Sequence, residues 1–121
     1  MFQKTGNVNE KLQATLNIEL SNGANFECLL DTGFQGTIVV PRQFAEQHAL
    51  EITGREAFIG AENSSIEFDT AIAEIKWLGD IFVLPILVSE SIEALIGVDM
   101  FVDTILEIDY INSTVKITKP K

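Results

Sequence analysis

The chain has 121 residues, of which 46% are hydrophobic, so it is long enough to bury one core, and we expect a single domain over residues 1–121. Its 18 acidic and 8 basic residues give a formal net charge of -10, which argues against binding to nucleic acid or to an anionic membrane surface. The longest apolar run, Ile81 to Val88, is far shorter than the ~20 residues of a membrane-spanning helix. Cys28 is the only cysteine and Met1 to Gln13 is too polar for a secretory leader, so we expect a cytoplasmic protein.

The amino-terminal part of the chain has the pattern of a β-hairpin. Apolar residues alternate with polar ones from Leu12 to Leu20, which is the period of a strand with one buried face. The run 21–23 reads Ser-Asn-Gly and predicts a tight turn, because Asn and Gly tolerate positive φ. Asn25 to Leu30 is expected to return as the partner strand and to end at Asp31.

A second group of predicted elements follows. Thr37 to Val40 predicts a short strand that stops at Pro41, and proline suits the first turn of a helix over Arg42 to Leu50. Three strands are then expected, with a polar tip (62–65) after the first and a turn (78–80) after the second: Ala57–Ala61, Ile66–Trp77 and Ile81–Val88.

The carboxyl-terminal part predicts short elements only. Ala94 to Ile96 has the pattern of a short buried strand, Gly97 allows a close approach of backbone, and Val98 to Asp103 fits a short helix. Two closing strands are expected over Ile105–Tyr110 and Thr114–Thr118, before a frayed end. The sequence therefore predicts a mostly antiparallel β domain with two short helices.

One acidic residue ends an apolar strand. The run Leu29–Gly33 reads Leu-Leu-Asp-Thr-Gly, so the carboxyl group of Asp31 lies where desolvation makes its charged form costly, before a hydroxyl and a flexible backbone position. An ordinary turn is the alternative interpretation, since Asp, Thr and Gly all favour turns. The run Leu95–Gly97 is a faint echo, again an apolar strand that reaches a glycine before a helix.

With these two motifs and the predicted hairpin between them, the sequence resembles the retropepsin-like aspartic proteases, retroviral proteases among them. Their signature is two apolar residues followed by Asp-Thr/Ser-Gly and, later, an apolar pair with Gly before a helix. The resemblance spans roughly Leu12 to Ile117. It implies an all-β, retropepsin-like acid protease fold, which is a closed, barrel-like domain with a flap hairpin and two short helices.

Phe34 is the main departure from that signature. It makes the string Asp-Thr-Gly-Phe, which is similar to a bacterial subgroup of the clan rather than to the viral enzymes, where a small residue usually follows the glycine. A bulky side chain beside the acid is expected to narrow the cleft or to change the hydrogen bonding of the acid.

The resemblance implies an aspartic endopeptidase that acts as a homodimer. The chain has one Asp-Thr-Gly, so a pair of catalytic carboxylates takes Asp31 from each of two chains. Two carboxylates within hydrogen-bond reach share one proton. One then takes a proton from the water that attacks a peptide carbonyl, while the other hydrogen-bonds the carbonyl oxygen. We expect no metal and no cofactor.

The resemblance also assigns roles at the site. The catalytic set is Asp31, Thr32 and Gly33, in which Thr32 hydrogen-bonds across the two-fold axis and Gly33 leaves room for substrate backbone. The chain termini are expected to add strands to the dimer interface. Substrate contacts are expected from both sides of the cleft: Phe34, Ile59, Gly60, Ala61, Ile96 and Val98.

The hairpin from Phe58 to Phe68 occupies the position of the family's flap, which closes over a bound peptide and excludes water. Gly60 is expected to let it bend. An ordinary exposed hairpin is the alternative, since the tip lacks a glycine-rich run. The expected substrate is an extended peptide or protein segment that pairs its backbone with the flap and the cleft floor, with hydrophobic side chains at the cut.

Two functions from other classes stay open. One is a non-catalytic module that binds peptide with the same fold, for which Phe34 is the best sequence support, and the other is a structural dimer that does neither. The remaining candidate residues have plainer interpretations. His48 is expected at the surface, Cys28 and Trp77 in the core, and Asp99 in the first turn of a helix.

Overall fold

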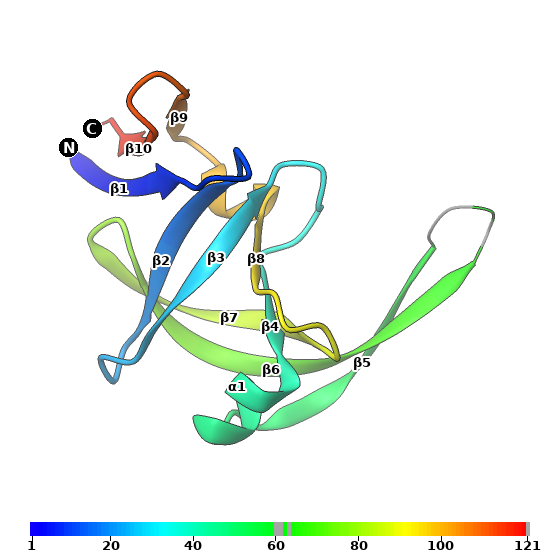
Figure 1. Ribbon diagram of the computed structural model, residues 1–121. Helices are drawn as coiled ribbons and strands as arrows, with labels where there is room; N and C mark the ends of the chain where they lie inside the picture. Colours follow the sequence, from blue (N-terminus) through cyan, green and yellow to red (C-terminus); the bar gives the residue numbers. More distant parts are fainter. Residues whose placement is uncertain (60–61, 63, 121) are drawn as a thin grey trace.

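The computed structural model describes residues 1–59, 62 and 64–120, and these form one ten-stranded sheet with little helix (Figure 1). The all-β class predicted from the sequence is confirmed. The strands are β1 (Phe2–Val8), β2 (Ala14–Leu20), β3 (Asn25–Asp31), β4 (Ile38–Pro41), β5 (Ile52–Ile59), β6 (Ser65–Trp77), β7 (Asp80–Ser89), β8 (Leu95–Gly97), β9 (Ile105–Asp109) and β10 (Thr114–Lys119). The helical segments are α1 (Arg42–Gln47) and a 3₁₀ turn, η2 (Val98–Phe101).

The sheet curls back on itself. Its strand order is β5-β6-β7-β4-β8-β3-β2-β1-β10-β9, and β6 also pairs with β2 through Glu19 and Leu20. Most neighbours are antiparallel, but β3 pairs with β8 in parallel, and so does β4 with β7. Strand β8 lies between β3 and β4, with Asp31 opposite Gly97 and Ile38 opposite Ile96. The two apolar motifs of the sequence therefore lie side by side at the centre of the fold.

The core fills the inside of this curled sheet. It is built from apolar residues that alternate along the strands, as on β2, where Leu16, Ile18 and Leu20 are buried. Trp77 closes one end, and its indole N–H donates to the carbonyl oxygen of Met100 at 3.0 Å. Cys28 is fully buried, as predicted, and burial, with a smaller effect from Glu27, raises the pKa of its thiol, which makes it unreactive.

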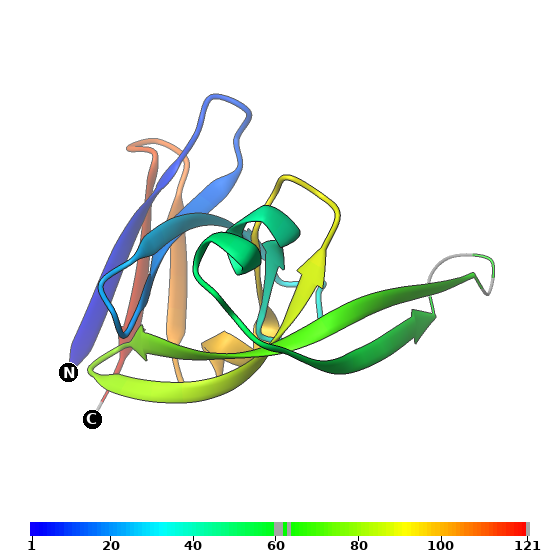
Figure 2. The same ribbon diagram turned by 90° about the horizontal axis from the view of Figure 1, so that it is seen from below.

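Strand β1 was not predicted from the sequence. It pairs with β10 along most of its length, from Phe2 opposite Lys119 to Asn7 opposite Thr114, and with β2 at its end. The polar residues of β1 form a strand because their backbone groups pair with β10 and β2, and not because one face of the strand is buried. Figures 1 and 2 both show the chain termini next to each other as a result.

The terminal strands thus pair within the chain. Strand β1 lies between β2 and β10, and β10 lies between β1 and β9, so neither has a free edge, whereas β5 and β9 end the strand order. The expectation that the chain termini add strands to a dimer interface stays a prediction, for which β9 is the edge strand near the carboxyl terminus.

Other corrections are local. Leu12 was expected on a strand, but it lies exposed in a turn with φ 61°, because the Asn9 side chain accepts hydrogen bonds from the backbone N–H groups of Lys11 and Gln13. Helix α1 ends at Gln47 rather than at residue 50. The second predicted helix is only the 3₁₀ turn η2, which ends at Phe101 rather than at residue 103.

The hairpin of β5 and β6 projects from the body of the molecule (Figure 2). Strand β5 begins at Ile52, five residues before the predicted start, and pairs with β6 up to Ile59 opposite Ser65. Gly60 and Ala61, which were expected to contact substrate, lie outside the described residues, and so does the side chain of Ile59. Within the described part of the chain, no helix has the length and apolar composition that crossing a membrane requires.

Candidate active site

Asp31 is the last residue of β3, and its carboxylate is held by its own loop. The backbone N–H of Gly33 donates to Oδ1 of Asp31 at 3.1 Å, and the N–H of Phe34 donates to the Asp31 carbonyl oxygen at 3.1 Å. Asp31 is half-buried, whereas Thr32 and Gly33 are exposed. The acid is therefore fixed in direction at a turn whose outer residues are open to solvent or to a partner.

The loop after Asp31 is held against the second motif by backbone hydrogen bonds. Gly97 donates to the carbonyl oxygen of Thr37 at 2.7 Å, and Val98 donates to that of Phe34 at 2.9 Å. The hydroxyl of Thr37 donates to the carbonyl oxygen of Pro85 on β7 at 2.7 Å. The loop thus cannot move without breaking contacts to both β8 and β7.

Gly97 has to be a glycine for this contact to exist. A Cβ atom at this position would overlap the carbonyl oxygen of Gly36 and the ring of Phe34. The sequence analysis predicted a close approach at Gly97, and the partner is the loop of the acid. The later motif therefore positions the Asp31 loop.

A hollow of about 330 Å³ lies beside Asp31. Its walls come from the acid's loop, from β4, from β6 of the hairpin and from the segment between β7 and β8, and its lining residues are Asp31, Phe34, Val39, Phe68, Ser89, Ser91, Glu93 and Leu95. Four of these side chains are apolar. An apolar side chain of a ligand would thus be buried within reach of a carboxylate.

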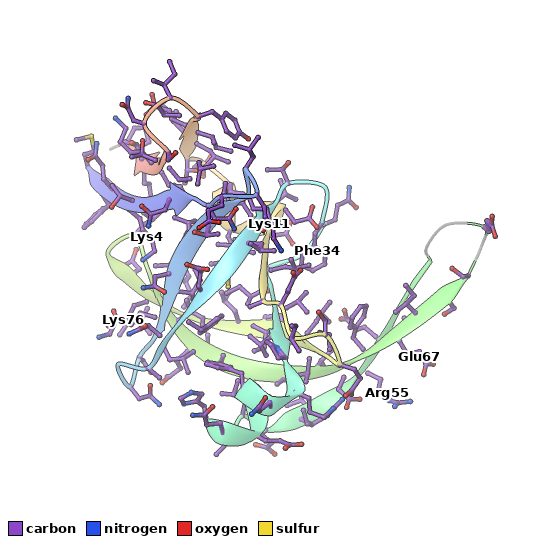
Figure 3. All side chains as sticks on the ribbon, viewed as in Figure 1. Lys4, Lys11, Phe34, Arg55, Glu67 and Lys76 are labelled. Atoms are coloured by element: carbon purple, nitrogen blue, oxygen red, sulfur yellow. The ribbon has the colours of Figure 1, made fainter. Side chains whose placement is uncertain are left out.

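The predicted substrate contacts meet different outcomes. Phe34 is half-buried and lines the hollow beside Asp31. Figure 3 labels its side chain. Val98 begins η2 and is 37% exposed. Ile96 is fully buried in the core, so its side chain supports the site from beneath and does not reach a ligand. Sequence reasoning missed Phe68 and Leu95, because only the strand register brings them to Asp31.

A network of charged side chains ties the base of the hairpin to the body. Asp69 on β6 accepts hydrogen bonds from Arg42 at 2.7 Å and from Arg55 at 3.1 Å. Arg42 also pairs with Glu90 at 2.6 Å, and Arg55 pairs with Glu67 at 3.1 Å. The hydrogen bonds from Arg42 and then Arg55 hold the pKa of Asp69 below its ordinary value.

This network lies on the outer face of the hairpin. Arg55 is paired with Asp69 across the two strands, whereas Glu56 is paired with Phe68, which lines the hollow. Because successive side chains of a strand point to opposite faces, the ion pairs are turned away from the hollow. Figure 3 shows Arg55 and Glu67 on the side of the hairpin away from Phe34.

Two solved structures share this architecture. A retropepsin-like aspartic protease from Rickettsia conorii superimposes with a TM-score of 0.67 at 13% sequence identity, over 95% of this chain and 89% of that chain. The chain has the retropepsin-like fold. EIAV protease, complexed with the inhibitor HBY-793, superimposes with a TM-score of 0.61 at 20% identity, over 77% of this chain and 88% of that chain. No model of a known protein family matches the sequence, and no curated protein does.

In this retropepsin-like fold, the chain supplies one Asp-Thr-Gly, at the end of β3. A single chain therefore brings one carboxylate of this motif to the site. One carboxylate beside an apolar hollow can accept a proton or a hydrogen bond, but it cannot do both jobs of a general acid and a general base at once.

Proposed function

We propose that this chain is one subunit of a homodimeric aspartic endopeptidase, whose site pairs Asp31 with Asp31 of a second copy. The observation that carries the proposal is the setting of Asp31. Its carboxylate is fixed at an open turn, next to an apolar hollow of about 330 Å³ and under a projecting hairpin. The string from Asp31 to Phe34 further supports a place in the bacterial Asp-Thr-Gly-Phe subgroup.

The proposed reaction is the hydrolysis of a peptide bond by water. Two carboxylates about a hydrogen bond apart hold one proton between them, because both cannot ionise cheaply. The charged carboxylate takes a proton from the water as its oxygen attacks the carbonyl carbon, and the protonated one donates a hydrogen bond to the carbonyl oxygen. The proton gained from the water then passes to the leaving amine.

The proposed dimer is isologous, with the two Asp31 loops facing each other across a two-fold axis. Thr32 and Gly33 are exposed in the isolated chain, which supports a contact made through this turn. Thr32 is proposed to hydrogen-bond across the axis, and Gly33 to leave room for substrate backbone. Because β1 and β10 have no free edge, this interface does not depend on adding a strand from either of them.

The proposed substrate is an extended peptide or protein segment that enters between the hairpin and the Asp31 loop. Phe68 and Leu95 offer it apolar walls. Gly60, Ala61 and the side chain of Ile59 are kept as proposed flap contacts. We place the reaction in the cytoplasm, a setting that a chain with one buried, unpaired cysteine permits.

The experiment compares hydrolysis of a broad peptide library by the wild-type protein, by Asp31→Asn and by Asp80→Asn as a matched control. Asp80 is exposed and belongs to no ion pair among the described contacts. We expect cleavage within pH ~3 to 7 that a statine-type transition-state mimic inhibits and that Asp31→Asn lowers by at least ~10²-fold.

The same assay distinguishes the rival functions. A confirmed dimer that binds peptides from the library but cleaves none would identify a binding module. A dimer that neither binds nor cleaves would identify a structural role. Asp31→Asn that cleaves as fast as Asp80→Asn would remove Asp31 from the reaction.

A further inference from the structure

The ring of Phe34 packs against the backbone of two glycines, Gly36 and Gly97. A Cβ atom on Gly36 or on Gly97 would run into this ring, so the ring lies directly against both backbones. The two segments that contain these glycines are held together by hydrogen bonds from the N–H of Asp99 to the carbonyl oxygen of Gly36, at 3.1 Å, and from the N–H of Gly97 to the carbonyl oxygen of Thr37, at 2.7 Å. Phe34 is thus a rigid part of the cleft floor, and its bulk is directed onto the glycines rather than onto the carboxylate of Asp31.

The same ring separates two hollows. On one side is the apolar hollow of about 330 Å³ that contains Asp31. On the other side is a hollow of about 220 Å³, whose lining includes Phe34, Gly36, Glu56 and Asp99. Phe34 is the residue common to both linings. The floor therefore consists of a hollow, a ridge formed by the ring, and a second hollow.

The hairpin lies opposite this ridge. Phe68 borders the first hollow and Glu56 the second, and these two residues are paired across β5 and β6. A peptide that lies over both hollows, between the hairpin and the floor, passes over Phe34. An extended peptide advances ~3.3 Å per residue, so neighbouring residues of one bound peptide lie over the hollow, the ridge and the second hollow.

We propose that Phe34 determines substrate specificity by size. It requires a residue with a small side chain over the ring, while a bulky apolar residue occupies the hollow beside Asp31. This inference rests on the proposed function and names its substrate class: peptides with a Gly, Ala or Ser close to a large apolar residue at the cut. A hydrophobic site discriminates by ~10 to 200-fold for the loss or gain of small groups, which sets the expected effect.

The test is a library of peptides randomised at the four positions nearest the cut, cleaved by the wild-type protein, Phe34→Ala and Phe34→Leu. Because the proposed dimer carries one Phe34 from each subunit, we expect wild type to require a small residue at one position on each side of the cut. Phe34→Ala should accept Leu or Phe at these two positions with kcat/KM raised at least ~10-fold, and Phe34→Leu should lie between the two. The other two positions should keep their preferences.

The control is Phe82→Ala, the same truncation at a half-buried ring that lines neither hollow. It should leave every size preference unchanged. The inference is overturned if folded Phe34→Ala keeps the wild-type preference at all four positions, or if its preference changes equally at all of them. If Phe34→Ala does not fold, an unchanged preference in folded Phe34→Leu overturns it equally.

Failure of the inference differs from failure of the proposed function. Without cleavage by wild type, the second measurement is calorimetric binding of two statine-type mimics that differ only in a small or a bulky group at the ridge position. Tighter binding of the small-group mimic to wild type, with the preference lost in Phe34→Ala, supports the size filter in a non-cleaving protein. Equal binding of both mimics to wild type overturns it.

Discussion

At Gly97 two segments of backbone lie so close that no side chain fits between them. The neighbouring atoms are the carbonyl oxygen of Gly36 and the ring of Phe34, both on the loop that follows Asp31. A single methyl group there has to push this loop away from β8. The consequence reaches the acid, because the same loop fixes its carboxylate through the N–H of Gly33.

We therefore expect Gly97→Ala to destabilise the protein by about 1–3 kcal/mol, the usual cost of forcing a group into a packed site. Gly54→Ala is the matched control, since its Cβ would lie 3.4 Å from Oγ1 of Thr70, an ordinary contact. Its unfolding free energy should stay within about 0.5 kcal/mol of wild type. Denaturant unfolding measures both, and equal stability of Gly97→Ala and Gly54→Ala would contradict the close approach.

At the scale of single residues, the sequence predicted which residues could take part in a reaction better than it predicted which side chains touch each other. The acid and the close approach at Gly97 follow from residue types, since a carboxyl group at the end of an apolar strand is an unusual choice and a glycine is the residue that allows close backbone contact. The packing of the Phe34 ring against Gly36 and Gly97 does not follow from residue types, because these two glycines are far apart in the chain. Ile96 was misassigned for a similar reason, since an apolar residue beside a motif gives no sign of which face it takes.

At the scale of elements, the base of the β5–β6 hairpin carries a network of ion pairs that links it to α1 and to the loop after β7. Its Arg55 is largely exposed, and Asp69 joins it to Arg42 at the start of α1. Glu67 and Glu90 face the same two guanidinium groups from β6 and from the loop after β7. The anchorage of the hairpin should therefore vary with pH.

The sign follows from the pKa of Asp69, which the two arginines lower in the folded protein. A group of this kind stabilises the fold fully above its unfolded pKa of ~3.9, and this contribution is lost as pH falls through the lower folded value. We expect Asp69→Asn to be less stable than wild type at pH 7, and the gap to narrow below pH ~4. Denaturant unfolding at both pH values checks this.

Asp109 also has a lowered pKa, caused by hydrogen bonds from Asn112, but it is present in both proteins and cancels in the comparison. Asp80→Asn should match wild type at pH 7. A gap between wild type and Asp69→Asn that is the same at pH 7 and pH 3 would mean that the charge of Asp69 does not stabilise the hairpin.

The sequence predicted most strands, because alternation or an apolar run marks every element with a buried face. It missed β1 and the first half of β5, both of which are largely exposed. Such strands are stabilised by their neighbours, through the pairing of β1 with β10 and through the ion pairs of Arg55. The local pattern of apolar residues does not predict the pairing of β1 with β10 or the ion pairs of Arg55, since both depend on residues far away in the sequence.

At the scale of the whole molecule, the fold is complete but the proposed site is not. Terminal strands β1 and β10 pair within the chain, and the core is closed around β2 and β6. The chain has one Asp-Thr-Gly, whereas the proposed reaction uses two carboxylates, one as acid and one as base. The proposal of a partner chain comes from the motif count in the sequence, but the in-chain pairing of the termini required the strand register.

The most direct test of the shared Asp31 pair is to mix wild-type protein with folded Asp31→Asn protein under conditions in which subunits exchange, and to follow peptide hydrolysis. Random pairing in an equal mixture leaves about half of the wild-type chains with a wild-type partner, so activity should fall to about half and should continue to fall as more Asp31→Asn is added. The same additions of Asp80→Asn should not lower it. Activity that is unchanged by an excess of exchanging Asp31→Asn chains would show that one chain holds a complete site, which contradicts the shared Asp31 pair.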